Sequence, residues 1–190
     1  MSDKLKPENL DTNSAFNRIL ADDVCSTINV PPATNSAMDG YVFHHDDLNN
    51  NGVTHLPISQ RICAGEMGEP LQKGTCARIF TGAPIPDNSN TVIMQEWVNV
   101  EDNHIIFNRQ LESGSNCRLA GEDIKQGQVI LTKGTKIRAQ ELGLIASIGL
   151  TAVNVYCKTN VGLFLTGNEL VEPGQDLKAG QIYDSNSYTL

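Results

Sequence analysis

The middle of the chain, residues 34–120, consists of short apolar runs separated by turn-forming residues, and none of these runs has a helical period. Runs of this length bounded by turn residues are typical of strands. We therefore expect strands at residues 41–43, 56–64, 75–80, 91–100 and 104–108. The residues between the last two runs, Glu101, Asp102 and Asn103, predict a hairpin. This stretch must therefore build a small, mostly β domain.

The segment before this centre is mixed in type. Residues 14–20 carry Ala15, Phe16, Ile19 and Leu20 at helical spacing and predict a short helix. Residues 24–30 alternate and predict a strand that ends at the Pro31-Pro32 pair. We thus expect one short helix and one strand here.

The segment after the centre returns to longer elements. Residues 128–131 and 152–157 predict strands, and residues 138–147 predict a helix for which Gly149 is a natural C-terminal residue. The expected apolar face of this helix consists of Ala139, Leu142, Ile145, Ala146 and Ile148.

The final segment has a third pattern. Residues 161–165 form a continuous apolar run, which favours a strand buried on both faces of a parallel α/β sheet. Residues 184–187 then predict the N-terminal cap of a helix. Because one strand cannot complete a parallel sheet, we expect the sequence to stop inside an α/β domain.

Composition excludes several classes of protein. The net charge of −8 argues against nucleic-acid binding, and an anionic ligand would need a local cation such as Mg²⁺ or a few Lys and Arg residues. No apolar run approaches the roughly 18 residues that span a membrane, and the polar first residues lack a secretory signal, which predicts a cytoplasmic protein. The five cysteines and four histidines lack metal-ligand spacing, which disfavours a zinc or cysteine-nucleophile enzyme.

Two polar clusters in the centre of the chain are candidate sites. Asp39 precedes Gly40 and is consistent with a ligand-binding carboxylate or with a simple Asx turn. Thr81 precedes Gly82 and is consistent with a phosphate contact or with a rigid connector between strands. Taken alone, the purely structural interpretation is favoured at both positions.

Two further clusters follow the centre. Glu122 and Asp123 after Gly121 suit Mg²⁺, which prefers hard oxygen ligands, or form a solvated acidic turn. Residues 166–169 follow the predicted buried strand, with residues 184–186 behind them. In α/β sheets such loops open at the carboxyl edge where ligands bind, and the predicted helix would direct its N-terminal N–H groups there. A binding role is favoured for this last cluster.

The order of these motifs is more specific than any one of them. They are FNRILADDV (16–24), NSAMDGYV (35–42), RIFTGAPIP (78–86), VIMQE (92–96), GEDI (121–124), LFLTGNEL (163–170) and GQIYDSNS (180–187). In this order they resemble the molybdopterin molybdenumtransferases, including the E domain of gephyrin, from about Phe16 to Leu190.

The resemblance implies an α+β, multi-part fold. An elongated linker domain, residues 1–33 and 121–158, would be interrupted by the mostly-β domain, residues 34–120. Residues 159–190 would begin an α/β molybdopterin-binding domain that is truncated. Members of the family are usually homodimers, with a cleft between the α/β domain of one subunit and the inserted domain of the other.

The resemblance also implies a reaction. Adenylylated molybdopterin and molybdate would react with Mg²⁺ present to give molybdenum cofactor and AMP. Catalytic and Mg²⁺-binding roles would fall on Asp39, Asp123 and Glu169. Substrate-binding roles would fall on Ser36, Thr81, Arg118, Asp184 and Asn186.

The sequence departs from the family pattern in three ways. The long N-terminal helix is largely absent, Arg118 is the one basic residue just before GEDI, and the glycine-rich ligand loop and C-terminal β domain are missing. We therefore expect an incomplete active site. The alternative is a non-catalytic dimerisation or scaffold module derived from the same family.

Overall fold

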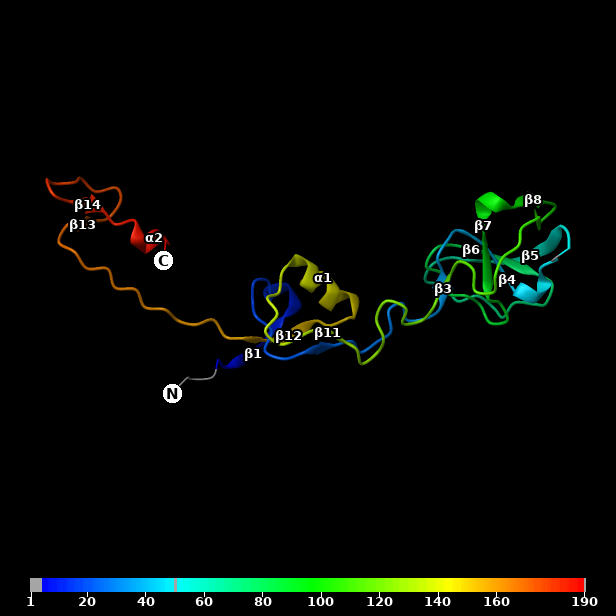
Figure 1. Ribbon diagram of the computed structural model, residues 1–190, viewed down its shortest axis with the longest axis horizontal. Helices are drawn as coiled ribbons and strands as arrows, with labels where there is room; N and C mark the ends of the chain where they lie inside the picture. Colours follow the sequence, from blue (N-terminus) through cyan, green and yellow to red (C-terminus); the bar gives the residue numbers. More distant parts are fainter. Residues whose placement is uncertain (1–4, 50, 190) are drawn as a thin grey trace.

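The computed structural model describes residues 5–49 and 51–189. Figure 1 shows an elongated molecule with a larger β body at one end, a smaller body with α1 in the middle, and a C-terminal segment at the other end. The fold is mostly β, with few helices.

The larger body is a curled six-stranded sheet. Its strand order is β7 (Thr91–Met94), β4 (Gly40–Phe43), β6 (Cys76–Ile79), β5 (Thr54–Ile62), β9 (His104–Phe107) and β8 (Asn99–Glu101). Strands β5 and β6 run parallel, and the other neighbours pair antiparallel. One face packs a core that includes Phe43, Leu56, Ile93 and Ile105, and the other a core that includes Val42, Ile62, Ile79 and Val92.

Most strand predictions for this body are confirmed. The predicted hairpin is also present, since Asp102 and Asn103 take positive φ angles of 47° and 61° between β8 and β9. The single strand predicted at residues 91–100 is wrong, because the 3₁₀ helix η3 (Gln95–Trp97) divides it. The Gln95 N–H donates to the Asp39 carbonyl at 3.1 Å, which turns the chain at that point.

The smaller body joins distant parts of the chain. Strand β1 (Pro7–Asp11) pairs antiparallel with β12 (Ala152–Tyr156), and β2 (Val24–Cys25) pairs antiparallel with β11 (Val129–Leu131). The core includes Leu20, Ile137, Ile145, Ile148 and Val155, each at most 1% exposed. Long-range strand pairing therefore holds this body together.

The helix predicted at residues 14–20 is wrong. Only the short 3₁₀ helix η1 (Thr12–Ser14) forms, and Asn17 then takes a φ of 62°, which a helix cannot continue. Beyond it, the N–H of Asn17 donates to Ile137 and that of Leu20 to Thr135. Pairing with a distant loop thus buries Ala15 and Leu20, whereas Phe16 and Ile19 stay 52% and 37% exposed.

The strand predicted at residues 24–30 is also too long. The Ser26 hydroxyl donates to the Ile28 carbonyl at 2.7 Å, so the chain turns after Cys25. Val30 then forms an isolated bridge to Ile124, ahead of the two prolines.

Helix α1 (Ala139–Ser147) confirms its prediction, and Gly149 follows it with a φ of 78°. The predicted face is right at Ile145 and Ile148, which are buried, and wrong at Ala139 and Ala146, which are exposed. Glu141 lies inward instead, at 7% exposure. Its carboxylate accepts from the backbone and guanidinium of Arg138, so its charge is paired.

The two bodies are connected by chain segments that run together. Strand β3 (Asn35–Ser36) leaves for the larger body and pairs antiparallel with β10 (Cys117–Arg118), which returns from it. The remaining short element of the larger body is η2 (His45–Asp47).

The buried strand predicted at residues 161–165 is wrong. No strand forms there in the described part of the chain, and the side chains of Val161 and Phe164 are 82% and 92% exposed. A parallel strand needs neighbours for its backbone and cover for its faces, and this segment has neither among the described residues. Nearby, β13 (Leu170–Val171) and β14 (Ile182–Tyr183) form a short parallel pair.

The predicted cap at residues 184–187 is confirmed. Asp184 Oδ1 accepts from the N–H groups of Asn186 and Ser187 at 3.0 and 3.3 Å, at the start of α2 (Asn186–Thr189). The proposed domain boundaries stay a prediction, and residues 1–4, 50 and 190 within them lie outside the described residues. Across the residues that are described, no helix combines the length and apolarity needed to cross a membrane.

Candidate functional site

One edge of the six-stranded sheet collects several polar residues. Strands β5 and β6 are parallel and end together, β4 is antiparallel to β6 and begins there, and β7 ends beside the start of β4. This topology brings Asp39, Thr81 and Gln95 to the same place from three strand ends. The chain order alone separates Asp39 and Thr81 by 42 residues.

Asp39 and Thr81 form the central contact at this edge. Asp39 Oδ1 accepts from the Thr81 N–H at 2.8 Å and from the Thr81 hydroxyl at 2.9 Å. These two hydrogen bonds, and to a smaller extent the charge of Arg78, lower the pKa of Asp39 below its ordinary value. Both side chains are exposed, and Oδ2 has no protein partner within the described chain. The result is an oriented, ionised carboxylate with one oxygen available to a ligand.

Ser36 shapes the turn that carries Asp39. Its side chain is 1% exposed, and the hydroxyl donates to the Met38 carbonyl at 2.6 Å. The Ser36 carbonyl accepts from the Gly82 N–H at 2.8 Å, which ties this turn to the one after Thr81. The Ser36 hydroxyl is therefore committed within the protein.

Arg78 is a member of this site that our sequence reasoning did not assign. Its Nη1 donates to the Gly40 carbonyl at 3.0 Å, and its Nη2 donates to Gln95 Oε1. The guanidinium also lies 5.0 Å from the ring centre of Tyr41 and 4.7 Å from that of Phe80. It joins β4, β6 and η3 behind the Asp39–Thr81 contact. The strand register places Arg78 opposite Tyr41, and no feature of the sequence indicates that register.

A second predicted cluster lies where the chain returns from the larger body. Arg118 Nη2 pairs with Asp123 Oδ2 at 2.5 Å, and Arg118 Nε lies 3.9 Å from Glu122 Oε1. Glu122 also accepts from the Leu119 N–H at 2.9 Å. The hydrogen bond that Arg118 donates to Asp123 raises the pKa of Arg118. Asp123 is thus neutralised locally by Arg118.

The third cluster belongs to the C-terminal segment. Glu169 is exposed at the start of β13, and its carbonyl accepts from the Ile182 N–H at 2.8 Å. Asp184 caps α2, and Asn186 is the first residue of that helix. The Glu169–Ile182 bond brings the loop and the DSN turn together, as the motif order predicts.

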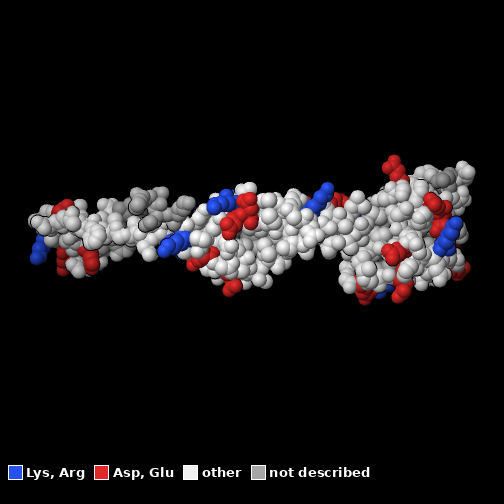
Figure 2. Space-filling model, turned by 90° about the horizontal axis from the view of Figure 1, so that it is seen from below, with Lys and Arg blue, Asp and Glu red and all other residues white. Residues whose placement is uncertain are grey.

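The structure does not gather the three predicted metal ligands. Asp39, Asp123 and Glu169 belong to the larger body, the connecting segments and the C-terminal segment, which Figure 1 shows spread along the molecule. Across residues 5–49 and 51–189, no three His, Cys, Asp or Glu side chains are placed to hold one metal ion. On the face drawn in Figure 2, acidic and basic side chains are interspersed along the molecule.

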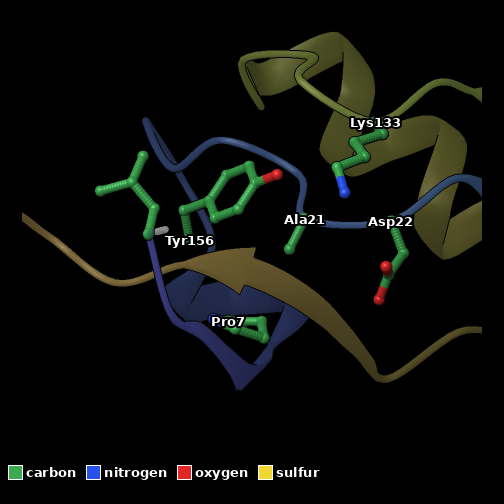
Figure 3. Close-up of a pocket in the computed structure, with 6 residues that line it drawn as sticks. Pro7, Ala21, Asp22, Lys133 and Tyr156 are labelled. Atoms are coloured by element: carbon green, nitrogen blue, oxygen red, sulfur yellow. The ribbon is translucent and has the colours of Figure 1, made fainter. Parts of the chain in front are cut away.

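A hollow of about 390 Å³ lies elsewhere, in the smaller body (Figure 3). It is lined by Leu5, Pro7, Ala21, Asp22, Lys133 and Tyr156. The Lys133 ammonium lies 5.8 Å from the ring centre of Tyr156, and Asp22 accepts from Asn154 at 2.9 Å. None of the sequence-predicted site residues lines this hollow. We place the candidate site at the sheet edge, where predicted residues contact one another.

Similarity to known proteins agrees with the motif order. Residues 2–149 match the family model of the MoeA N-terminal region (domain I and II). The chain is 42% identical to the molybdopterin molybdenumtransferase of Haemophilus influenzae over 184 residues, which cover 96% of this chain and 45% of that protein. It is 38% identical to the Nostoc enzyme of the same name over 187 residues, or 96% of this chain and 43% of that protein.

A solved structure has the same fold. The chain superimposes on the molybdopterin biosynthesis MoeA protein of Pyrococcus horikoshii with a TM-score of 0.92 and 33% identity, covering 98% of this chain and 51% of that one. The chain thus spans about half the length of the proteins it matches. With a family model matching most of its residues, the chain belongs to the MoeA family, in the region that comprises domains I and II.

Proposed function

We propose that this chain acts in molybdenum cofactor biosynthesis as the N-terminal part of a molybdopterin molybdenumtransferase. The reaction would join molybdate to adenylylated molybdopterin and release AMP. The names of the relatives at 42% and 38% identity support this activity. The alignments cover under half of each relative, so the activity of the whole protein is part of the proposal.

The observation that carries the proposal is the Asp39–Thr81 contact. Two hydrogen bonds to Oδ1 fix the carboxylate and lower its pKa, which keeps it charged and leaves Oδ2 accessible. A preoriented charge of this kind can hold a cation or a donor group of a substrate at low reorganisation cost. Asp39 would contact the substrate or its cation, and Thr81 would hold Asp39 in place.

Mg²⁺ is the cation that this reaction implies, and the described residues of one chain do not form a complete site for it. No described group of three acidic or histidine side chains is placed for a metal, and Asp123 is paired with Arg118. Mg²⁺ prefers several oxygen ligands in octahedral geometry. A site that uses Asp39, Asp123 and Glu169 together would need more than one copy of the chain, which supports the homodimer as part of the proposal.

The proposal also gives roles to the other candidate site residues. Arg118 would bind an anionic part of the substrate, and Asp184 and Asn186, in the turn that lies near Glu169, would contact its polar groups. Ser36 would act on the substrate through the turn it shapes, because its hydroxyl is already hydrogen bonded. A cytoplasmic location is part of the same proposal.

The direct test is AMP release by this chain from adenylylated molybdopterin, molybdate and Mg²⁺. We expect the Asp39→Asn variant to lose at least about tenfold of any activity, since a positioned charge is worth a few kcal/mol to a transition state. Asp176→Asn is the matched control, because Asp176 is an exposed carboxylate outside the three clusters. Equal losses in both variants would contradict a specific role for Asp39.

A second candidate is a non-catalytic dimerisation or scaffold module. A folded chain that releases no AMP, yet sediments as a dimer, would support the module. AMP release that Asp39→Asn abolishes would support the transferase.

A further inference from the structure

Two arginines share one aromatic ring at the edge that holds Asp39 and Thr81. Arg61 lies opposite Arg78 in the parallel β5–β6 register, one residue before the end of β5. The guanidinium carbons of Arg61 and Arg78 lie 4.8 and 4.7 Å from the ring centre of Phe80. Phe80 directly precedes Thr81. In a chain with a net charge of −8, this places two cations beside one turn.

The two guanidinium groups differ in what they bind. Arg78 donates hydrogen bonds to the Gly40 carbonyl and to the Gln95 side chain. Arg61 is exposed and has no hydrogen-bond or ion-pair partner within the described residues. A guanidinium carries five N–H donors, and stacking on a ring orients its plane without using any of them. Arg61 is therefore an oriented cation with free donors.

Two acidic residues at this edge form hydrogen bonds to other groups, although Oδ2 of Asp39 has no partner within the described chain. Asp39 Oδ1 accepts twice from Thr81, and Glu96 Oε1 accepts from Gln95 Nε2 at 3.1 Å. Neither carboxylate pairs with Arg61. The planar fork of a guanidinium matches two oxygens of a tetrahedral oxyanion.

We propose that Arg61, stacked on Phe80, binds a tetrahedral oxyanion beside the Asp39–Thr81 contact. A phosphate group and molybdate are both tetrahedral oxyanions, so both belong to the class of ligand that we propose here. The proposal rests on the proposed function, since both of its substrates carry such groups. It adds an anion contact from β5, which none of the site motifs includes.

The test is a titration of the ¹⁵N-labelled chain with sodium phosphate and, separately, with sodium molybdate, at constant ionic strength. The Nε–Hε signal of Arg61 should shift and saturate, and Arg61→Gln should weaken binding by roughly three- to tenfold. Arg109→Gln is the matched control, because Arg109 also stacks on an aromatic ring, at 4.2 Å from the centre of Trp97. It should bind like the wild type. The anion that saturates at lower concentration identifies the preferred source.

A second variant separates the stack from the charge. Phe80→Leu keeps Arg61 but removes its aromatic support, and it should weaken anion binding while the urea midpoint confirms folding. Equal affinity in wild type and Arg61→Gln, or an equal loss in Arg109→Gln, would overturn the site. These binding results stand apart from AMP release: unchanged binding overturns the Arg61 site even in an active chain, whereas Arg61-dependent binding supports it even in an inactive one.

Discussion

Gly40 has no room for a side chain. A Cβ built on it would lie 2.0 Å from the carbonyl oxygen of Ile93 and 2.9 Å from its carbonyl carbon. Ordinary van der Waals contact begins at 3.4 Å, so the backbone of β7 would have to move by about 1.4 Å. The obstacle is backbone inside a strand pair, which no rotamer change can relieve. We therefore expect Gly40→Ala to separate β4 from β7 locally.

The cost follows from this geometry. Overpacking a well-packed interior costs about 1–3 kcal/mol, and the upper end applies where backbone must move. Each ladder hydrogen bond lost adds about 1 kcal/mol. We expect Gly40→Ala to lower the free energy of unfolding of the larger body by about 3 kcal/mol. It should also loosen Asp39, the residue that precedes Gly40.

The assay is urea unfolding with two probes. Trp97, the single tryptophan, lies in η3 and reports on the larger body, while far-UV circular dichroism also reports on α1 in the smaller body. The matched control is Gly143→Ala in α1, where nothing lies within 4 Å of the new Cβ. An exposed helical Gly→Ala change stabilises by about 0.5–1 kcal/mol, so the control should move in the opposite direction.

Two results would contradict the expected effect of Gly40→Ala. If the free energy of unfolding from Trp97 fluorescence is the same in Gly40→Ala and wild type, to within about 0.5 kcal/mol, the close approach of β4 and β7 is wrong. A loss that appears in circular dichroism but not in Trp97 fluorescence would place the damage in the wrong body.

Three further predictions concern burial and charge. The hydrogen bond from Arg138 lowers the pKa of Glu141 to about 2, from an ordinary value of 4.5, so the stability from this pair is complete above about pH 4.5 and is lost as the pH falls toward 2. Urea midpoints against pH should show this decline in wild type and not in Glu141→Gln; parallel curves would refute it. Burial raises the pKa of the Cys76 thiol to about 12, so iodoacetamide at about pH 8 should label the exposed Cys25 well before Cys76, as mass spectrometry can check. Equal labelling rates in folded protein would contradict that burial. Ile145→Ala, at a fully buried position, should destabilise the smaller body by about 2–5 kcal/mol in circular dichroism, and a change below about 0.5 kcal/mol would show that the site is not packed.

Local rules explain the elements that were predicted well. The hairpin at Asp102 and Asn103, helix α1 with Gly149 behind it, and the Asp184 cap each depend on residues a few positions apart. Turn chemistry, helical periodicity and capping act over that distance. The same locality explains why the order of short motifs was enough to indicate the family.

The helix predicted at residues 14–20 and the buried strand predicted at residues 161–165 do not form, because their structure depends on contacts with distant parts of the chain. The first run has the apolar spacing of a helix, but its N–H groups find carbonyls more than a hundred residues away, at Ile137 and Thr135. The second has the composition of a buried strand, yet it has no strand partner among the described residues. An apolar pattern states that a segment tends to be buried, and only tertiary contacts decide what covers it.

The candidate site divides in the same way. The sequence by itself indicated Asp39, Thr81, Asp123 and Glu169 as candidate residues, because they stand in glycine-flanked turns of recognisable order. Tertiary structure alone decided that Asp39 contacts Thr81, since the register that pairs Gly40 with Ile79 brings together these two residues, which are 42 apart in the sequence. It also decided that Arg78 is hydrogen bonded while Arg61 has no such partner among the described residues, and that Asp123 and Glu169 lie elsewhere along the molecule. Strand register and chain path are global properties, set by how the apolar faces of all the strands pack together.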